Sequence, residues 1–187
     1  MARDGDMIAE LTSDHREVEG LFERIATLPS GLQDRKRLID QLTIELVRHS
    51  VAEEAYLYPT VRERLPRGGT LADKEIEDHA KVETLLKRIE GCSADDPQLE
   101  QLFTEVQASV LSHLHDEEKN LFPQQLHRTC SPEDLAKLGD KIRLAKKTAP
   151  THPHPSAPTA PPANKLLAPG LGLVDRARDY VTGRGRS

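Results

Sequence analysis

"DHREVEGLFERI" (residues 14–25) and "DHAKVETLLKRI" (residues 78–89) are two near copies of one pattern, and the second lies 64 residues after the first. "HSVAEEAYLYP" (residues 49–59) recurs as "HLHDEEKNLFP" (residues 113–123) with the same offset. Four of the chain's eight histidines share this register. An internal repeat of this kind decides the architecture before any other feature does. The sequence therefore predicts two similar halves, each a helix–turn–helix.

The composition fits a helical domain with appendages. The chain has 187 residues, of which 36% are hydrophobic and only 3% are aromatic, so its core must be aliphatic. A net charge of −5 argues against a nucleic-acid partner, which requires a basic face. The sequence shows no signal-like start and no apolar stretch of membrane length, so we expect no membrane contact. Cys92 and Cys130 are isolated, which is typical of reduced thiols in a cytoplasmic protein.

Apolar residues recur every three or four positions in four long stretches, which indicates four helices. The stretches cover residues 8–22, 38–56, 76–89 and 102–121. Short turns separate them, and Pro59 and Pro123 are expected to kink or end the second and fourth helices. The predicted fold is all-α: an antiparallel up-down-up-down four-helix bundle of two pseudo-repeats.

The remaining sequence changes character towards its end. "SPED" (residues 131–134) predicts the start of a short fifth helix, which would complete a bundle domain at residues 1–147. Residues 148–165 are rich in Pro, Ala and Thr and predict an extended linker, in which His152 and His154 would have no role. Residues 166–187 form a basic tail that we expect to be disordered. The alternative is a helix that docks on a protein partner or lies on a membrane surface.

Each repeated histidine is followed one turn later by a glutamate within the apolar stripe. The four pairs are His15–Glu19, His49–Glu53, His79–Glu83 and His113–Glu117. A single buried pair is usually a satisfied hydrogen bond in the core. Four buried carboxylates in one register need a larger compensation, because burying an unpaired charge is costly. A metal centre would supply it, and imidazole with carboxylate suits iron or manganese, with zinc as an alternative.

The doubled pattern resembles the hemerythrin-like (HHE) domain over about residues 8–128. In that family each half carries a His on its first helix and then an HxxxE segment that often ends in LYP or LFP. The resemblance implies a non-haem centre of two iron ions joined by an oxo or hydroxo bridge. His15 and His49 would hold one iron and His79 and His113 the other. Glu53 and Glu117 would bridge the pair.

One position departs from the family's oxygen carriers. These proteins have a second His one turn after the ligand on the third helix, whereas this chain has Glu83. We count Glu83 among the candidate metal ligands. A carboxylate in place of an imidazole stabilises the ferric state over the ferrous state. The substitution favours redox turnover over reversible oxygen carriage.

Two functions follow as hypotheses. The first is a di-iron protein that reacts with hydrogen peroxide or dioxygen, with catalase-like disproportionation of peroxide as its reaction. The alternative is a non-catalytic module that binds or senses oxygen, nitric oxide or iron and contacts a protein partner through its tail.

A tyrosine is the candidate proton donor for such a reaction. Tyr56 is predicted to share a helical face with His49 and Glu53, where it would be catalytic or simply part of the core. Tyr58 is predicted to point away. Glu54 and Glu118 are expected to be solvated or to support the ligands.

Overall fold

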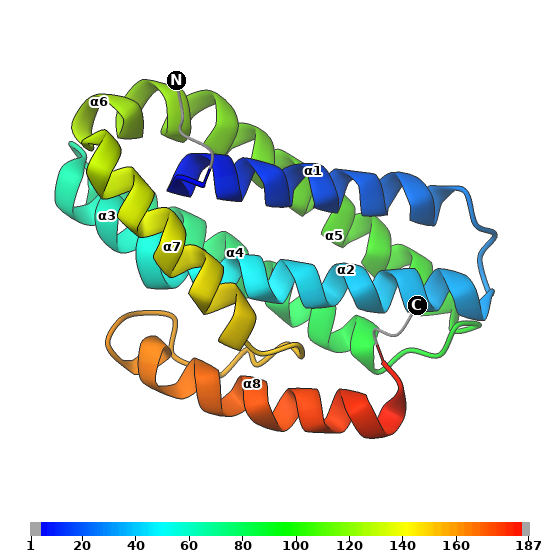
Figure 1. Ribbon diagram of the computed structural model, residues 1–187. Helices are drawn as coiled ribbons and strands as arrows, with labels where there is room; N and C mark the ends of the chain where they lie inside the picture. Colours follow the sequence, from blue (N-terminus) through cyan, green and yellow to red (C-terminus); the bar gives the residue numbers. More distant parts are fainter. Residues whose placement is uncertain (1–4, 185–187) are drawn as a thin grey trace.

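A computed structural model describes residues 5–184 of the chain. Four long helices form an antiparallel bundle (Figure 1), namely α1 (Met7–Ala26), α2 (Gln33–Ala52), α4 (Gly68–Glu90) and α5 (Pro97–Asp116). Helices α2 and α5 begin and end 64 residues apart, the offset of the sequence repeat. The prediction of an all-α bundle built from two similar halves is confirmed.

Each half continues beyond its second long helix through a π-helical segment. In the first half, η1 (Glu53–Leu57) leads into α3 (Tyr58–Arg64), and in the second half η2 (Glu117–Leu126) leads into α6 (His127–Thr129). Pro59 follows η1 directly and Pro123 lies within η2. A proline has no N–H and its ring crowds the carbonyl one turn earlier, and a wider π-helical turn accommodates both. At Pro59 the chain therefore continues as a helix through a wider turn instead of ending there.

Side-chain caps fix several helix starts. The carboxylate of Asp6 accepts a hydrogen bond of 2.9 Å from the Ala9 N–H, and that of Asp96 accepts one of 2.8 Å from the Gln98 N–H. The Ser131 hydroxyl accepts one of 3.1 Å from the Asp134 N–H at the start of α7 (Pro132–Thr148). These are favoured N-cap residues because their oxygens satisfy N–H groups that have no partner within the helix. The predicted fifth helix is confirmed as α7, which packs against α1 and α2.

The bundle core consists of two apolar clusters with a polar layer between them. Along α1, the cluster that contains Leu11 gives way to His15, and the second cluster begins at Val18. The order is reversed along α2, where Leu46 belongs to the second cluster and Leu57, in η1, to the first. Because neighbouring helices run in opposite directions, the repeated His and Glu positions meet at one level inside the bundle.

The C-terminal segment differs from its prediction. Residues 149–162, called the connector here, have no regular helix, yet Thr151 and His152 within it are buried. Helix α8 (Ala163–Thr182) follows and packs against α7 and η1 (Figure 1). The expected disordered tail is not confirmed for the described residues. Residues 185–187, also part of that prediction, lie outside the described residues.

Hydrogen bonds explain why this segment is held against the bundle. The buried Asp175 of α8 accepts hydrogen bonds of 3.1 Å from the backbone N–H groups of Thr151 and His152. The His152 ring also contacts Glu90 of α4 and, at 2.9 Å, Asp179 of α8. The expectation that His152 and His154 have no role is therefore wrong, because both rings pair with carboxylates.

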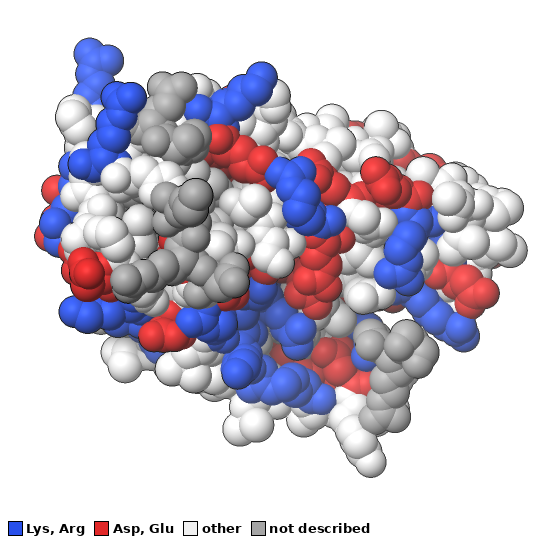
Figure 2. All heavy atoms as spheres, turned by 45° about the horizontal axis from the view of Figure 1, so that its top comes forward, with Lys and Arg blue, Asp and Glu red and all other residues white. Residues whose placement is uncertain are grey.

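The exterior carries charges of both signs. On the face drawn in Figure 2, acidic and basic side chains are interspersed over much of the surface, and basic side chains gather in its lower centre. No helix among residues 5–184 is both long and apolar enough to span a bilayer. Cys92 and Cys130 are free thiols.

Candidate metal centre

Six side chains make up the polar layer, which we call the His/Glu layer: His15, His49, His79, His113, Glu53 and Glu117. Each long helix contributes one histidine, and the first residue of each π-helical segment contributes one glutamate. His15 and Glu53 have no exposed surface, and Glu117 is 1% exposed. The structure thus brings together six of the seven residues that the sequence identified as metal ligands.

The Nε2 atoms of the four histidines point at the two carboxylates. The distance from Glu53 Oε2 is 3.2 Å to His49 Nε2 and 3.3 Å to His79 Nε2. Glu117 Oε2 lies 3.5 Å from His15 Nε2 and 3.7 Å from His113 Nε2. Each carboxylate therefore lies between histidines of different halves, the position that a bridging ligand requires.

The other ring nitrogen of every layer histidine meets a second carboxylate. His15 Nδ1 lies 2.8 Å from Glu118, and His49 Nδ1 lies 3.4 Å from Asp14. The corresponding distances are 3.2 Å from His79 to Glu54 and 2.8 Å from His113 to Glu75. In metal sites such partners fix the orientation and tautomer of a ligand imidazole, so that Nε2 is free to bind the ion.

Several buried polar atoms of the layer form no hydrogen bond of good geometry among the described residues, although each histidine Nε2 has a carboxylate oxygen 3.2–3.7 Å away. They are His15 Nε2, His49 Nε2, Glu53 Oε1 and Glu117 Oε2. Buried polar groups are almost always satisfied, and leaving one without a partner costs free energy. All four atoms belong to one group that could hold an ion, His15 with His49, Glu53 and Glu117. Two further groups adjoin it, namely Glu53 with His79 and His113, and Glu75 with His113 and Glu117. The donor set therefore fits bound metal cations.

The electrostatics of the metal-free layer show how strongly it favours positive charge. Burial lowers the pKa of His79, but its contacts with Glu53 and Glu54 outweigh burial and raise the pKa to about 9. Burial likewise opposes protonation of His113, yet the charge of Glu117 and contact with Glu53 hold its pKa well above the ordinary value. Burial raises the pKa of Glu53, while the surrounding histidines reverse this and hold it well below the usual range. The layer without metal therefore favours protonated imidazoles, which carry the positive charge that the buried carboxylates require.

Two glutamates that the sequence placed with the ligands lie outside the layer. Glu19 is partly exposed and pairs with Arg16. The expectation that it would be one of four buried carboxylates is therefore wrong. Glu83 accepts a hydrogen bond of 2.8 Å from the backbone N–H of His154 in the connector. In neither pair does the glutamate face inward with its histidine. On α1 the side chain of Glu19 lies at the surface, and on α4 the side chain of Glu83 faces the connector.

The tyrosine assignment is reversed in the structure. Tyr58 is buried, and its hydroxyl lies 3.0 Å from His79 Nε2 and 3.3 Å from both Glu53 and Glu117. The ring of Tyr56 instead packs against Lys165 of α8. The cause is η1, in which the Tyr58 N–H bonds to the Glu53 carbonyl five residues earlier and brings Tyr58 over Glu53. A prediction based on an ordinary α-helix cannot account for this shift.

Asp14 and Glu75 support ligand histidines but were missed from the sequence. Asp14 is repeated as Asp78, the residue before the histidine in each half, which was a usable signal. That signal holds only in the first half, because His113 is supported by Glu75 and not by Asp78. Glu54 and Glu118 were correctly considered as supporting residues.

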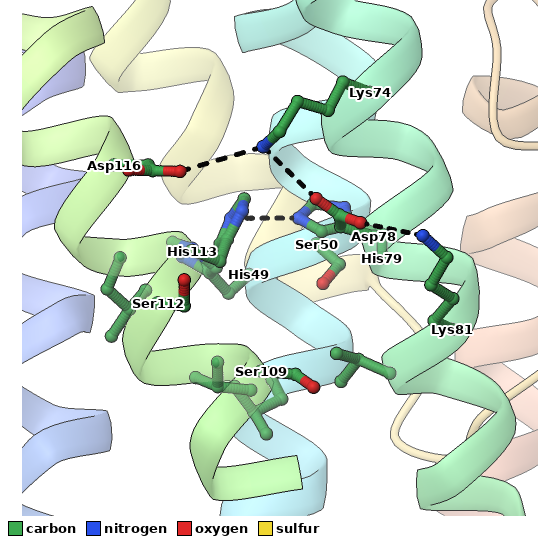
Figure 3. A pocket seen from close by; sticks show the side chains of 14 residues that line it. His49, Ser50, Lys74, Asp78, His79, Lys81, Ser109, Ser112, His113 and Asp116 are labelled. Atoms are coloured by element: carbon green, nitrogen blue, oxygen red, sulfur yellow. Dashed lines mark hydrogen bonds and ion pairs between the residues drawn. The ribbon is translucent and has the colours of Figure 1, made fainter. Parts of the chain in front are cut away.

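A pocket of about 180 Å³ opens onto the layer between α2, α4 and α5. His49, His79 and His113 line its inner end (Figure 3). Its rim carries Lys74, whose ammonium lies 3.3 Å from Asp78 of the same helix and 3.8 Å from Asp116 of α5. The layer is therefore buried, and this pocket reaches it from the side of α2, α4 and α5.

Comparison with known proteins agrees with this site. Residues 6–124 match the family described as the Hemerythrin HHE cation binding domain, and the chain belongs to this family. The matched region contains the whole His/Glu layer and Tyr58. The resemblance inferred from the sequence is confirmed.

Two known proteins are similar to the chain. It is 29% identical to an uncharacterized hemerythrin-like protein of Schizosaccharomyces pombe over 169 residues, which cover 90% of this chain and 82% of that protein. It is 26% identical to a DNA nickase of Nostoc over 135 residues, 71% of this chain and only 37% of the nickase.

A solved structure shares the fold. The crystal structure of an HHE cation binding domain-containing protein from Mycobacterium kansasii superposes with a TM-score of 0.66. The match covers 76% of this chain and 85% of that one at 22% identity.

Proposed function

We propose that the chain is a non-haem di-iron protein that reacts with hydrogen peroxide or dioxygen. His15 and His49 would hold one ion and His79 and His113 the other, with Glu53 and Glu117 between them. The observation that supports this most directly is the convergence of the layer's ligand atoms in adjoining groups, of which the group of His15, His49, Glu53 and Glu117 contains the buried atoms without a hydrogen bond of good geometry. Nitrogen and oxygen donors without thiolate suit iron, although manganese shares this preference.

Two adjacent iron ions would supply the electrons that peroxide or dioxygen chemistry requires. The protein's own contribution is to fix the ligands and to exclude bulk water. Asp14, Glu54, Glu75 and Glu118 orient the imidazoles, and apolar clusters close the bundle above and below the layer. A site built in this way needs little rearrangement between oxidation states.

Tyr58 is our candidate for the proton donor. Burial raises the pKa of its phenol well above 10, and the negative charges of Glu53 and Glu117 raise it further, so the hydroxyl keeps its proton. That hydroxyl lies within 3.3 Å of both glutamates and 3.0 Å of His79 Nε2. It is therefore positioned to pass a proton to an oxygen atom bound at the layer.

The reaction that we propose is disproportionation, in which two molecules of hydrogen peroxide give two of water and one of dioxygen. One peroxide is reduced and the other oxidised, so no further reductant is needed. The test is to mix the iron-loaded protein with excess peroxide and record dioxygen release. Release of many equivalents per chain supports catalysis, whereas a single stoichiometric spectral change without dioxygen would contradict it.

The second candidate is a sensor, which one contact favours. The connector N–H of His154 binds Glu83, one turn from His79 on the same helix, and thus links the C-terminal segment to a ligand helix. A change at the iron site could reach α8 through this contact. For a sensor, the same peroxide experiment should give a single stoichiometric spectral change without release of dioxygen.

A further inference from the structure

We propose that the outer face of α8 binds the surface of a membrane that contains anionic lipids. This face lies outside the His/Glu layer, and its binding does not depend on which metal the layer holds. Helix α8 lies along the outside of the bundle (Figure 1). Two features of that position carry the proposal: the side on which α8 bears its apolar residues, and the cations that border this side.

Helix α8 has its apolar and acidic residues on the opposite sides from those of an ordinary surface helix. Both of its acidic residues, Asp175 and Asp179, face inward and hold the connector. An ordinary surface helix buries its apolar stripe against the core and turns its charges to solvent. In α8 six large hydrophobic side chains, called the outer stripe here, are each more than half exposed: Leu166, Leu167, Leu173, Val174, Tyr180 and Val181.

The outer stripe is continuous along the helix. Leu166, Leu173 and Val181 recur at intervals of seven and eight residues, which places them on one side of an α-helix. Leu167 and Val174 lie next to the first two along the chain. Single exposed apolar residues are normal on a protein surface, whereas a contiguous apolar patch marks an interaction site. The outer stripe is therefore a binding surface.

Basic side chains without acidic partners border the outer stripe. Successive residues of a helix are turned by about 100°, so Lys165 lies at one border of the stripe and Arg178 at the other. Both are exposed, and among the described residues neither forms an ion pair with a carboxylate. Arg176, on the same border as Lys165, donates only to the backbone carbonyl oxygens of Lys147 and Ala149. The outer face of α8 thus combines apolar surface with uncompensated positive charge.

A pair of lysines adds to this positive charge where α8 meets α7. The Lys165 ammonium lies 4.2 Å from the centre of the Tyr56 ring, and that of Lys141 on α7 lies 6.0 Å from it. Partial burial lowers the pKa of Lys165, and the charge of Lys141 lowers it further. Within the described part of the chain, no acidic side chain pairs with either lysine. An anionic group bound beside them would relieve their repulsion.

The charges favour a membrane over a second copy of the chain. Two outer stripes packed together would bring the cations of both α8 helices close, because the acidic residues of α8 point the other way. A bilayer with anionic lipids attracts these cations and accepts an amphipathic helix that lies in the plane of its surface. No helix of residues 5–184 could span a bilayer, so the contact is with one surface only. The expectation of no membrane contact considered only spanning segments, and this proposal replaces it.

The test is co-sedimentation of the full chain with vesicles of mixed phosphatidylglycerol and phosphatidylcholine, and with vesicles of phosphatidylcholine alone. A double variant, Leu166→Gln with Leu173→Gln, removes apolar surface from the outer stripe. Leu32→Gln is its matched control, because Leu32 is an exposed leucine at the start of α2. Arg178→Gln removes a border cation, and Arg37→Gln, at an exposed arginine of α2, is its control.

The parent protein should bind the anionic vesicles at low salt and be released as salt screens its cations. The double leucine variant should bind about tenfold or more weakly, and Arg178→Gln about fivefold more weakly, both with unchanged helicity. The two control variants should bind like the parent.

Three results would overturn the proposal. The first is no binding of the parent protein to anionic vesicles, or equal binding to both kinds of vesicle. The second is equal binding by the parent and the double leucine variant. The third would come from light scattering without lipid: a dimeric parent and a monomeric double leucine variant would show that a second copy of the chain covers the outer stripe.

Discussion

Each layer histidine has two carboxylate neighbours, one at each ring nitrogen, and this arrangement explains how imidazoles and acids can share a buried core. The sequence identified the six layer residues because a shared offset of 64 residues places equivalent positions at one level of a bundle. It failed at Glu19 and Glu83, which have the same spacing from their histidines but leave the layer. Spacing along a helix shows which residues share a face, whereas packing between helices decides which part of the face is buried.

Tyr58 gives the sharpest prediction for a single residue. Tyr58→Phe should retain both irons but lower the rate of peroxide turnover by about a hundredfold, a typical contribution of general acid catalysis. Tyr56→Phe is the matched control and should turn over at the parent rate, because its ring faces Lys165. Dioxygen release and iron content would be measured for both variants. A parent rate in Tyr58→Phe would show that its hydroxyl only fills space.

At the scale of elements, periodicity predicted the four long helices and α7, because their apolar stripes and caps are local properties. It could not predict η1, since the wider turn arises around Pro59 and is not visible as a change of pattern. Helix α8 was only the alternative to a disordered tail, for another reason. Its acidic residues Asp175 and Asp179 look solvated in the sequence, but they hold the connector against the bundle. Docking of this kind depends on distant partners.

Gly172 tests whether α8 docks as described. A Cβ at this glycine would lie 2.2 Å from the Thr148 carbonyl oxygen, while one at Gly170 would meet nothing within 4 Å. Gly172→Val should therefore displace α8 and cost about 1–3 kcal/mol, the usual range for overpacking. Gly170→Val should keep α8 docked. Limited proteolysis of the connector would compare them, and equal resistance in both variants would contradict the docking.

At the scale of the whole molecule, the layer lies between the two apolar clusters of the core. The metal-free chain satisfies this layer with protons on His79 and His113, whereas a metal ion must displace them. The stability of the bundle should therefore depend on metal and on pH together, which the sequence alone could not quantify.

Removal of iron should lower the melting temperature, because an ion that binds only the folded chain stabilises it. Each kcal/mol of that stabilisation corresponds to about 2–4 °C for a chain of this size. The folded pKa of His79 lies above its ordinary value, so its protonation stabilises the metal-free fold at low pH. That stabilisation is lost as the pH rises through about 9.

Iron affinity changes in the opposite direction, because fewer protons compete at high pH. Calorimetric melting of iron-loaded and chelated protein should therefore show a difference that widens from mildly acidic to mildly alkaline solution. A difference that is zero, or that narrows with rising pH, would contradict this view of the layer.

The most direct test of the central claim is the iron content of the purified chain after anaerobic loading and removal of free iron. The parent protein and His115→Ala should each hold about two irons per chain, since His115 is exposed on α5 and lies outside the layer. His49→Ala and His113→Ala should each lose most of this iron, because each removes a ligand from a different group. Two irons retained in both ligand variants would show that the His/Glu layer is not the metal centre.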